Sequence, residues 1–92
     1  MEVTVNYLSQ LKQVASIASE KVVLAAPYLV QDLVTQLAQK HGEPLSSFLL
    51  NAEGTLNNSI LVIIGDTQVH WETPVRLKEG DVVSFISPLA GG

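Results

Sequence analysis

Two glycines at the end of the sequence, Gly91 and Gly92, are the residues with the clearest chemical potential. Because neither has a side chain, this dipeptide has wide backbone freedom and could pass through a narrow channel. Pro88 precedes them, and since proline cannot donate to a sheet ladder, we expect the last strand to end near it. Such a tail could carry a bare main-chain carboxylate into the active site of another protein. A frayed chain end is the alternative, and the dipeptide alone favours it.

Other side chains that could do chemistry are few and dispersed. The sequence has no cysteine, which excludes disulfides, thiolate metal sites and thiol nucleophiles. The two histidines, His41 and His70, fall in separate elements without clustered carboxylates, so we expect no metal site. The acidic residues are also scattered, and paired-carboxylate hydrolysis has no support. These residues therefore indicate no catalytic constellation and no metal site.

Composition predicts one small domain with a lightly charged surface. The 92 residues are 47% hydrophobic and only 15% charged, which is enough for one modest core. The net charge is −4 and the five basic residues are spread along the chain, so we expect no nucleic-acid partner. No apolar run reaches the ~18 residues of a membrane span, and the opening residues alternate like a strand rather than a signal peptide. We expect no membrane contact and a cytoplasmic location.

The first quarter of the sequence predicts two strands joined through a short helix. Residues 1–8 alternate between apolar and polar side chains, which is typical of a strand with one buried face. Residues 9–18 place apolar side chains at helical spacing, with Ser9 available as an N-cap. Residues 21–25 are short and rich in β-branched side chains, which indicates a second strand that forms a hairpin with the first.

The strongest helix signal begins near Pro27. An apolar stripe recurs every three or four residues and predicts one main helix that packs on a sheet. We expect this helix to end at Gly42, where glycine can adopt the positive φ of a C-terminal cap. No Ser, Thr, Asp or Asn stands at the expected start, so the N-cap is weak. The stripe consists of Val30, Leu33, Val34, Leu37, Ala38 and His41.

The second half of the sequence predicts a helical turn and three more strands. One helical turn could form at Leu45, Phe48 and Leu49, with these apolar side chains packed against the core. A polar, turn-rich loop follows. Further strands are expected over residues 60–64, 68–71 and 82–87. The element order predicts an α+β fold in which the first and last strands lie side by side in parallel and one face of the sheet stays open.

Three stretches of the sequence resemble the ubiquitin-like sulfur carriers of the MoaD/ThiS family, and within it the branch of molybdopterin synthase small subunits. Residues 3–12 are similar to the family's first strand and following helix, 73–83 to its late turn, and 85–92 to its last strand, proline and Gly-Gly ending. The resemblance implies a β-grasp fold, a mixed sheet with one main helix packed on one face. It further implies a β-grasp domain over residues 1–86 and a flexible tail over 87–92.

By this resemblance, the family's chemistry would act at the carboxylate of Gly92, with Gly91 beside it at the reacting end. An E1-like adenylating enzyme would use ATP to activate the carboxylate, and a sulfur donor would convert it to a thiocarboxylate. The large subunit of molybdopterin synthase would then present the pterin substrate, so the catalytic groups would belong to the partners. The resemblance thus implies a chain that is not an enzyme on its own and that binds no cofactor. Lys12 stands where many members carry an arginine used towards the activating enzyme; lysine keeps the charge but loses the bidentate fork.

Alternation also places Leu8 and Ile86 on the open face of the sheet beside the tail, where we expect an apolar patch that docks a partner. Incidental exposed aliphatic side chains are the alternative. The residue types leave three other functions open: a sulfur carrier for thiamine or another pathway, a ubiquitin-like protein modifier joined through Gly92, and a binding domain whose Gly-Gly is incidental. Further partner contacts are expected from Lys12, Ser87, Pro88, Leu89 and Ala90.

Overall fold

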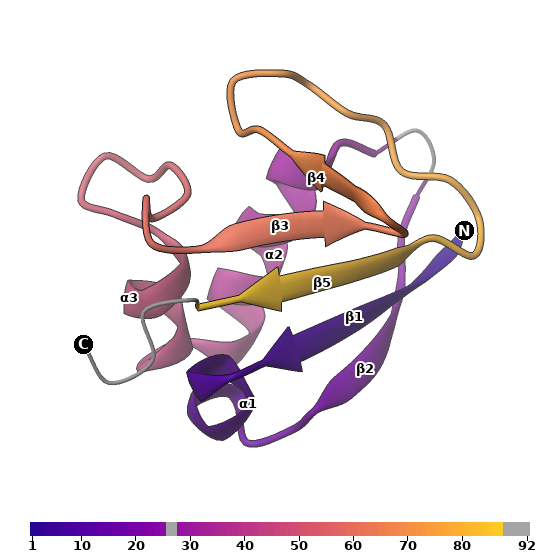
Figure 1. Ribbon diagram of the computed structural model, residues 1–92. Coiled ribbons are helices and arrows are strands. Elements are labelled where there is room, and N and C mark those ends of the chain that lie inside the picture. Colours follow the sequence, from indigo (N-terminus) through magenta and orange to yellow (C-terminus); the bar gives the residue numbers. More distant parts are fainter. Residues whose placement is uncertain (26–27, 88–92) are drawn as a thin grey trace.

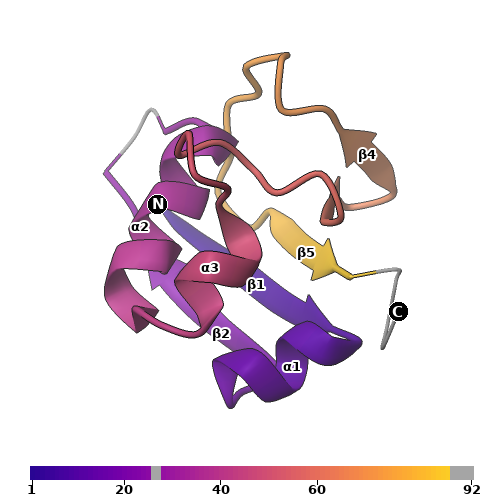
Figure 2. The same cartoon turned by 90° about the vertical axis from the view of Figure 1, so that its left-hand side faces the viewer.

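The computed structural model describes residues 1–25 and 28–87. Five strands form one mixed sheet in the order β2-β1-β5-β3-β4, and the helices α2 and α3 lie together on one of its faces (Figures 1 and 2). The α+β fold and the open opposite face are therefore confirmed. The elements are β1 (Glu2–Leu8), α1 (Gln10–Ala15), β2 (Ser19–Val23), α2 (Val30–His41), α3 (Leu45–Leu49), β3 (Leu61–Ile64), β4 (Thr67–Val69) and β5 (Val82–Ile86).

The two central strands, β1 and β5, run parallel, as the sequence predicts. Tyr7 pairs with Phe85 and Leu8 with Ile86. The antiparallel strand β2 flanks β1, and the antiparallel strand β3 flanks β5. The last strand thus has a hydrogen-bonded neighbour on both sides. In the described part of the chain, no helix is long and apolar enough to cross a membrane.

The core forms where the inward side chains of β1 and β5 meet the apolar stripe of α2. Alternation along β5 buries Val83 and Phe85 completely and leaves Ser84 and Ile86 on the other face. The α2 stripe is confirmed from Val30 to Ala38. Burying each large aliphatic side chain contributes ~1.5–3 kcal/mol to folding. The largest fully buried side chains are Tyr7, Phe85, Leu11, Leu33, Leu37, Leu45, Leu49, Val3, Val5, Val30, Val34 and Val83.

The helix α2 begins and ends at identifiable caps. At its start, the backbone N–H of Leu29 donates to the carboxylate of Asp32 at 3.3 Å, so the cap comes from the first turn of the helix rather than from a residue before it. At its end, Gly42 has φ +66°, as expected for a glycine cap, and its N–H donates to the carbonyl of Ala38 at 2.9 Å.

Some local expectations need correction. The strand β4 covers Thr67–Val69 rather than residues 68–71. The strand β2 begins at Ser19, two residues before the expected start. Ser9 holds the N-cap position of α1, but its φ is 57° and its hydroxyl makes no capping hydrogen bond. Phe48 is 38% exposed, whereas Leu45 and Leu49 are buried. A five-residue helix has less than a turn and a half, so the contact with the core is centred between Leu45 and Leu49 and leaves Phe48 at its margin.

Candidate partner-docking face

The open face of the sheet carries a row of three aliphatic side chains, which we call the apolar row: Leu8, Ile86 and Leu61. Ile86 pairs with Leu8 on one side and with Leu61 on the other, so the three side chains lie next to one another across β1, β5 and β3. Leu8 is 40% exposed, and the other two are partly exposed. The predicted neighbourhood of Leu8 and Ile86 is confirmed, and the row lies where β5 ends.

Leu61 is a member of the row that the sequence did not reveal. The run 60–64 is apolar at every position, so its pattern does not say which side chains face outward. The pairing of Val62 with the buried Phe85 settles this, because it turns Leu61 and Ile63 to the open face. A shallow hollow of about 210 Å³ lined by Leu61, Gln68 and His70 bounds this end of the row.

The next row of the open face is mostly polar. Ser84 pairs with Asn6 on one side and with Ile63 on the other. Beyond this row the face turns apolar again at Val82 and Val23, which are 40% and 74% exposed. The apolar row is therefore small and has a polar border, an arrangement typical of an interface with an apolar centre and polar rim.

The remaining predicted contact residues differ in where they lie. Lys12 is exposed on α1, and α1 lies at the same end of the sheet as the apolar row (Figure 1). Ser87 is only 6% exposed, so its side chain is not part of an open surface. The other predicted site residues lie outside the described part of the chain: Pro88, Leu89, Ala90, Gly91 and Gly92.

Behind the docking face, a polar cluster joins three elements through the carboxylate of Glu20 on β2. Its two oxygens accept from the Tyr7 hydroxyl at 2.7 Å and from the Lys40 ammonium at 2.6 Å, and Nε2 of His41 lies 2.7 Å away. The sequence pattern places His41 only at the end of the apolar stripe of α2. The cluster was not predictable, because Glu20 lies 13 residues from Tyr7 and 21 from His41.

The cluster shifts two pKa values. Burial raises the pKa of Glu20, but the hydrogen bonds with Lys40, Tyr7 and His41 and the charge of His41 outweigh it and lower the pKa to about 2. Burial, together with the hydrogen bond to Glu20 and its negative charge, raises the pKa of Tyr7. Tyr7 is therefore a neutral donor and Glu20 an ionised acceptor. Through Tyr7, which directly precedes Leu8 of the apolar row, the cluster connects β1 to β2 and to the end of α2.

Comparisons with known proteins give one family and several similar folds. Residues 5–92 match the model of the ThiS family. The search of curated proteins gives no significant match.

Solved structures with the same fold cover nearly the whole chain. The small archaeal modifier protein SAMP1 of Haloferax volcanii has a TM-score of 0.85 at 21% identity and covers 100% of both chains. A putative molybdopterin converting factor subunit 1 from Pyrococcus furiosus has a TM-score of 0.76 at 23% identity, covering 97% of this chain and 99% of its own. Urm1 of Trypanosoma brucei has a TM-score of 0.80 at 26% identity, covering 99% and 95%. The ubiquitin-like β-grasp fold is thereby confirmed.

Proposed function

Because the chain belongs to the ThiS family, we propose that it is a sulfur carrier that acts as the small subunit of a molybdopterin synthase in the cytoplasm. The observation that carries this proposal is the apolar row on the open face, at the end of the sheet where β5 ends and the chain continues towards Gly91 and Gly92. Two further findings support it: the family match extends to residue 92, and a putative molybdopterin converting factor subunit shares the fold.

The proposed chemistry takes place at the carboxylate of Gly92. A carboxylate is a poor acyl donor, so a carboxylate oxygen first attacks the α-phosphorus of ATP in an adenylating partner and releases pyrophosphate. A sulfur nucleophile then attacks the acyl carbon and displaces AMP, which leaves a thiocarboxylate. The larger subunit of the synthase would use that sulfur to build the dithiolene of molybdopterin from a pterin. The chain supplies no acid or base in these steps; it supplies the acyl group and the surface that docks it.

The docking roles follow from exposure and position. Leu8 and Ile86 would pack against an apolar surface of the large subunit, and Lys12 would face a carboxylate of the adenylating enzyme. Because Ser87 is buried, we assign the first tail contacts with a partner to Pro88, Leu89 and Ala90 rather than to Ser87. Glycine at the last two positions would avoid Cβ clashes in a narrow channel.

Intact mass spectrometry tests this proposal. The chain is incubated with an adenylating enzyme of the family, ATP and a sulfur donor, and we expect an oxygen-to-sulfur exchange that fragmentation places at Gly92. The Gly92→Ala variant should exchange far more slowly with an unchanged fold. A wild-type chain that keeps an unmodified carboxylate would exclude the sulfur-carrier role.

A protein modifier is the second candidate, because the fold is shared with a small archaeal modifier protein along the full length of both chains. In that role the activated Gly92 would be joined to lysine amines of other proteins. Ladders of isopeptide-linked products in cells, abolished by Gly92→Ala, would favour it.

The docking role has its own test. Ile86→Asp should weaken binding to the large subunit by at least about tenfold, since it places a charge at the centre of an apolar contact. Val23→Asp is the matched control. Val23 is a more exposed aliphatic residue on the same face, but it lies on the edge strand β2 and pairs with Glu2, at the other end of β1 from Leu8. Equal affinities for the two variants would remove the apolar row from the interface.

A further inference from the structure

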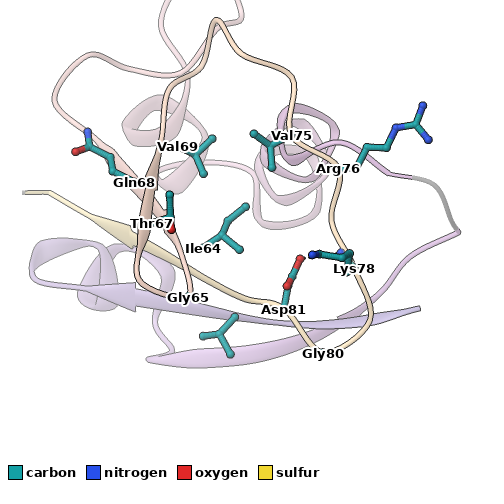
Figure 3. A pocket seen from close by; sticks show the side chains of 11 residues that line it. Ile64, Gly65, Thr67, Gln68, Val69, Val75, Arg76, Lys78, Gly80 and Asp81 are labelled. Atoms are coloured by element: carbon teal, nitrogen blue, oxygen red, sulfur yellow. The ribbon is translucent and has the colours of Figure 1, made fainter.

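A cleft opens between the edge strand β4 and the chain segment 74–78. It has a volume of about 570 Å³, which lies within the range of small-molecule ligand pockets. Figure 3 shows the side chains of Val69 and Val75 pointing towards each other across the cleft, with that of Ile64 also directed into it. The cleft therefore has an apolar interior between two stretches of extended chain.

One wall of the cleft presents the backbone of Arg76. This residue forms an isolated antiparallel bridge with Leu29. In that bridge the carbonyl of Val75 accepts from Val30 at 2.9 Å, and the N–H of Leu77 donates to Tyr28 at 2.8 Å. Because successive backbone groups of an extended chain point to opposite sides, the N–H and C=O of Arg76 point away from this bridge. The side chain of Arg76 projects away from the cleft in Figure 3, so its backbone forms the lining.

The opposite wall presents the backbone of Gln68. The hairpin of β3 and β4 turns on Gly65 and Asp66, so the pair Ile64–Thr67 next to the turn is the hydrogen-bonded one. The following pair, Ile63 with Gln68, is then non-bonded, and the backbone groups of Gln68 point to the free edge of β4.

The side chain of Gln68 also points away from the cleft in Figure 3, so Gln68 too lines it with its backbone. Within residues 1–25 and 28–87, no hydrogen bond engages the backbone N–H or C=O of Gln68 or Arg76 on this side.

We propose that this cleft is a slot for one extended peptide segment of a partner protein. The segment would pair its main chain with Gln68 on one side and with Arg76 on the other, as a strand added between two existing edges. An apolar side chain at its centre would pack between Val69 and Val75. The slot is independent of the proposed sulfur chemistry.

The charges around the slot favour an acidic segment. Among the lining residues, Arg76 and Lys78 are cations and Asp81 is the one acid. The Asp81 carboxylate is engaged, since it accepts the backbone N–H of Lys78 at 2.7 Å. In the described part of the chain, the ion pairs involve only Glu20 with Lys40 and His41, so Arg76 and Lys78 stay available. Because the Arg76 side chain projects away from the cleft, its cation lies beside the slot rather than inside it. Two cations and one acid still leave the surroundings of the slot net positive in a chain of net charge −4, and an apolar residue flanked by Asp or Glu fits there.

Along β5 the slot and the apolar row lie at opposite ends, whereas on β4 the residue Gln68 lines both the slot and the hollow beside Leu61. Val82, the first residue of β5, lines the slot, whereas Ile86, the last, belongs to the row. The five residues of β5 span roughly 13 Å at ~3.3 Å per residue. A partner held in the slot would therefore leave Leu8 and Ile86 of the apolar row uncovered, so that two partners could bind at once.

Peptide selection on the full chain tests the slot. Heptapeptides are selected from a phage-displayed random library, and those enriched are synthesised and measured by fluorescence anisotropy. We expect the selected peptides to have an apolar centre with acidic flanks.

Variants of the slot test the main-chain pairing. Gln68→Pro removes the N–H that faces the slot, a change that an edge strand tolerates, and should weaken binding about tenfold. Gln68→Ala keeps that N–H and should bind like the wild type. Lys78→Ala should weaken binding severalfold, unlike Lys21→Ala on the open face.

A measurement on the wild type does not depend on how the variants fold. Adding a selected peptide should shift the amide resonances of Gln68 and Arg76 and protect both from solvent exchange. No enrichment over a blocked surface would overturn the proposal, as would equal binding to Gln68→Pro and Gln68→Ala. Loss of binding on Leu8→Asp with shifts confined to the apolar row would also overturn it. So would a dimer that Gln68→Pro dissociates, because the occupant would then be a second copy of the chain.

Discussion

Replacing Glu20 by glutamine should destabilise the fold by roughly 2 kcal/mol at neutral pH. The drop of the Glu20 pKa from 4.5 to about 2 corresponds to about 3 kcal/mol in favour of the ionised form, at about 1.4 kcal/mol per pKa unit. Glu20 is 11% exposed, but the Lys40 side chain is 50% exposed and its share is screened by solvent. We therefore discount the figure to roughly 2 kcal/mol, which is equivalent to a fall in Tm of about 10 °C for a domain of this size.

The pH dependence of this effect has a definite sign. A carboxyl group whose pKa is lower in the folded state binds protons more readily when the chain unfolds. It therefore stabilises the fold at pH values above its pKa in the unfolded state, and this stabilisation is lost as the pH falls through its pKa in the folded state. For Glu20 the loss should run from about pH 4.5 down to about pH 2. The wild type should therefore lose roughly 2 kcal/mol more than Glu20→Gln over this range, and the two stabilities should converge in acid.

Urea denaturation followed by circular dichroism, at matched ionic strength from pH 7 to pH 2, measures both effects. Glu53→Gln is the control, because it makes the same substitution at an exposed loop position and should leave the stability within about 0.5 kcal/mol. Tyr7→Phe keeps the ring, which stacks on Phe85, but removes one donor to Glu20, and should reproduce part of the loss. Parallel pH profiles for wild type and Glu20→Gln would refute the reasoning.

Three further predictions concern stability and are read from urea midpoints at pH 7. Ser9→Gly should stabilise the chain by up to about 1 kcal/mol, because Ser9 has φ 57° without a capping bond to lose; no gain would mean that the serine side chain contributes there. Gly80→Ala should cost about 1–2 kcal/mol through its φ of +84° alone, since a Cβ would meet no atom within 4 Å. Phe48→Ser should stay within about 0.5 kcal/mol while Leu49→Ala costs ~2–5 kcal/mol; similar losses would place Phe48 in the core.

The sequence predicts those parts of the fold that a single period defines. Alternation in 1–8 and 82–87 places Leu8 and Ile86 on the open face, and the helical stripe identifies the buried side of α2. Both patterns are local and both are confirmed. The parallel pairing of first and last strands was also predictable, since one helix covers only one face of the sheet and the long intervening chain supplies the crossover.

Features that depend on tertiary geometry could not be read from the sequence. Leu61 belongs to an apolar run without alternation, so only its pairing with Ile86 assigns it a face. The contacts of Glu20 join residues on three elements, and no local pattern specifies them. The slot beside β4 depends on which way the backbones of Gln68 and Arg76 point, and side-chain patterns carry no information about that direction.

The position of β5 in the sheet suits the proposed role of the residues that follow it. A carrier whose end is drawn into the active site of a partner must resist being pulled open. An edge strand would separate from the sheet by breaking a single ladder of hydrogen bonds. β5 instead pairs with β1 on one side and β3 on the other, and its inward residues Val83 and Phe85 are fully buried. Peeling β5 would break two ladders and expose both side chains at once. We therefore expect β5 to be among the last parts of the fold to open, so that a partner acting on Gly92, as proposed, would not unfold the domain.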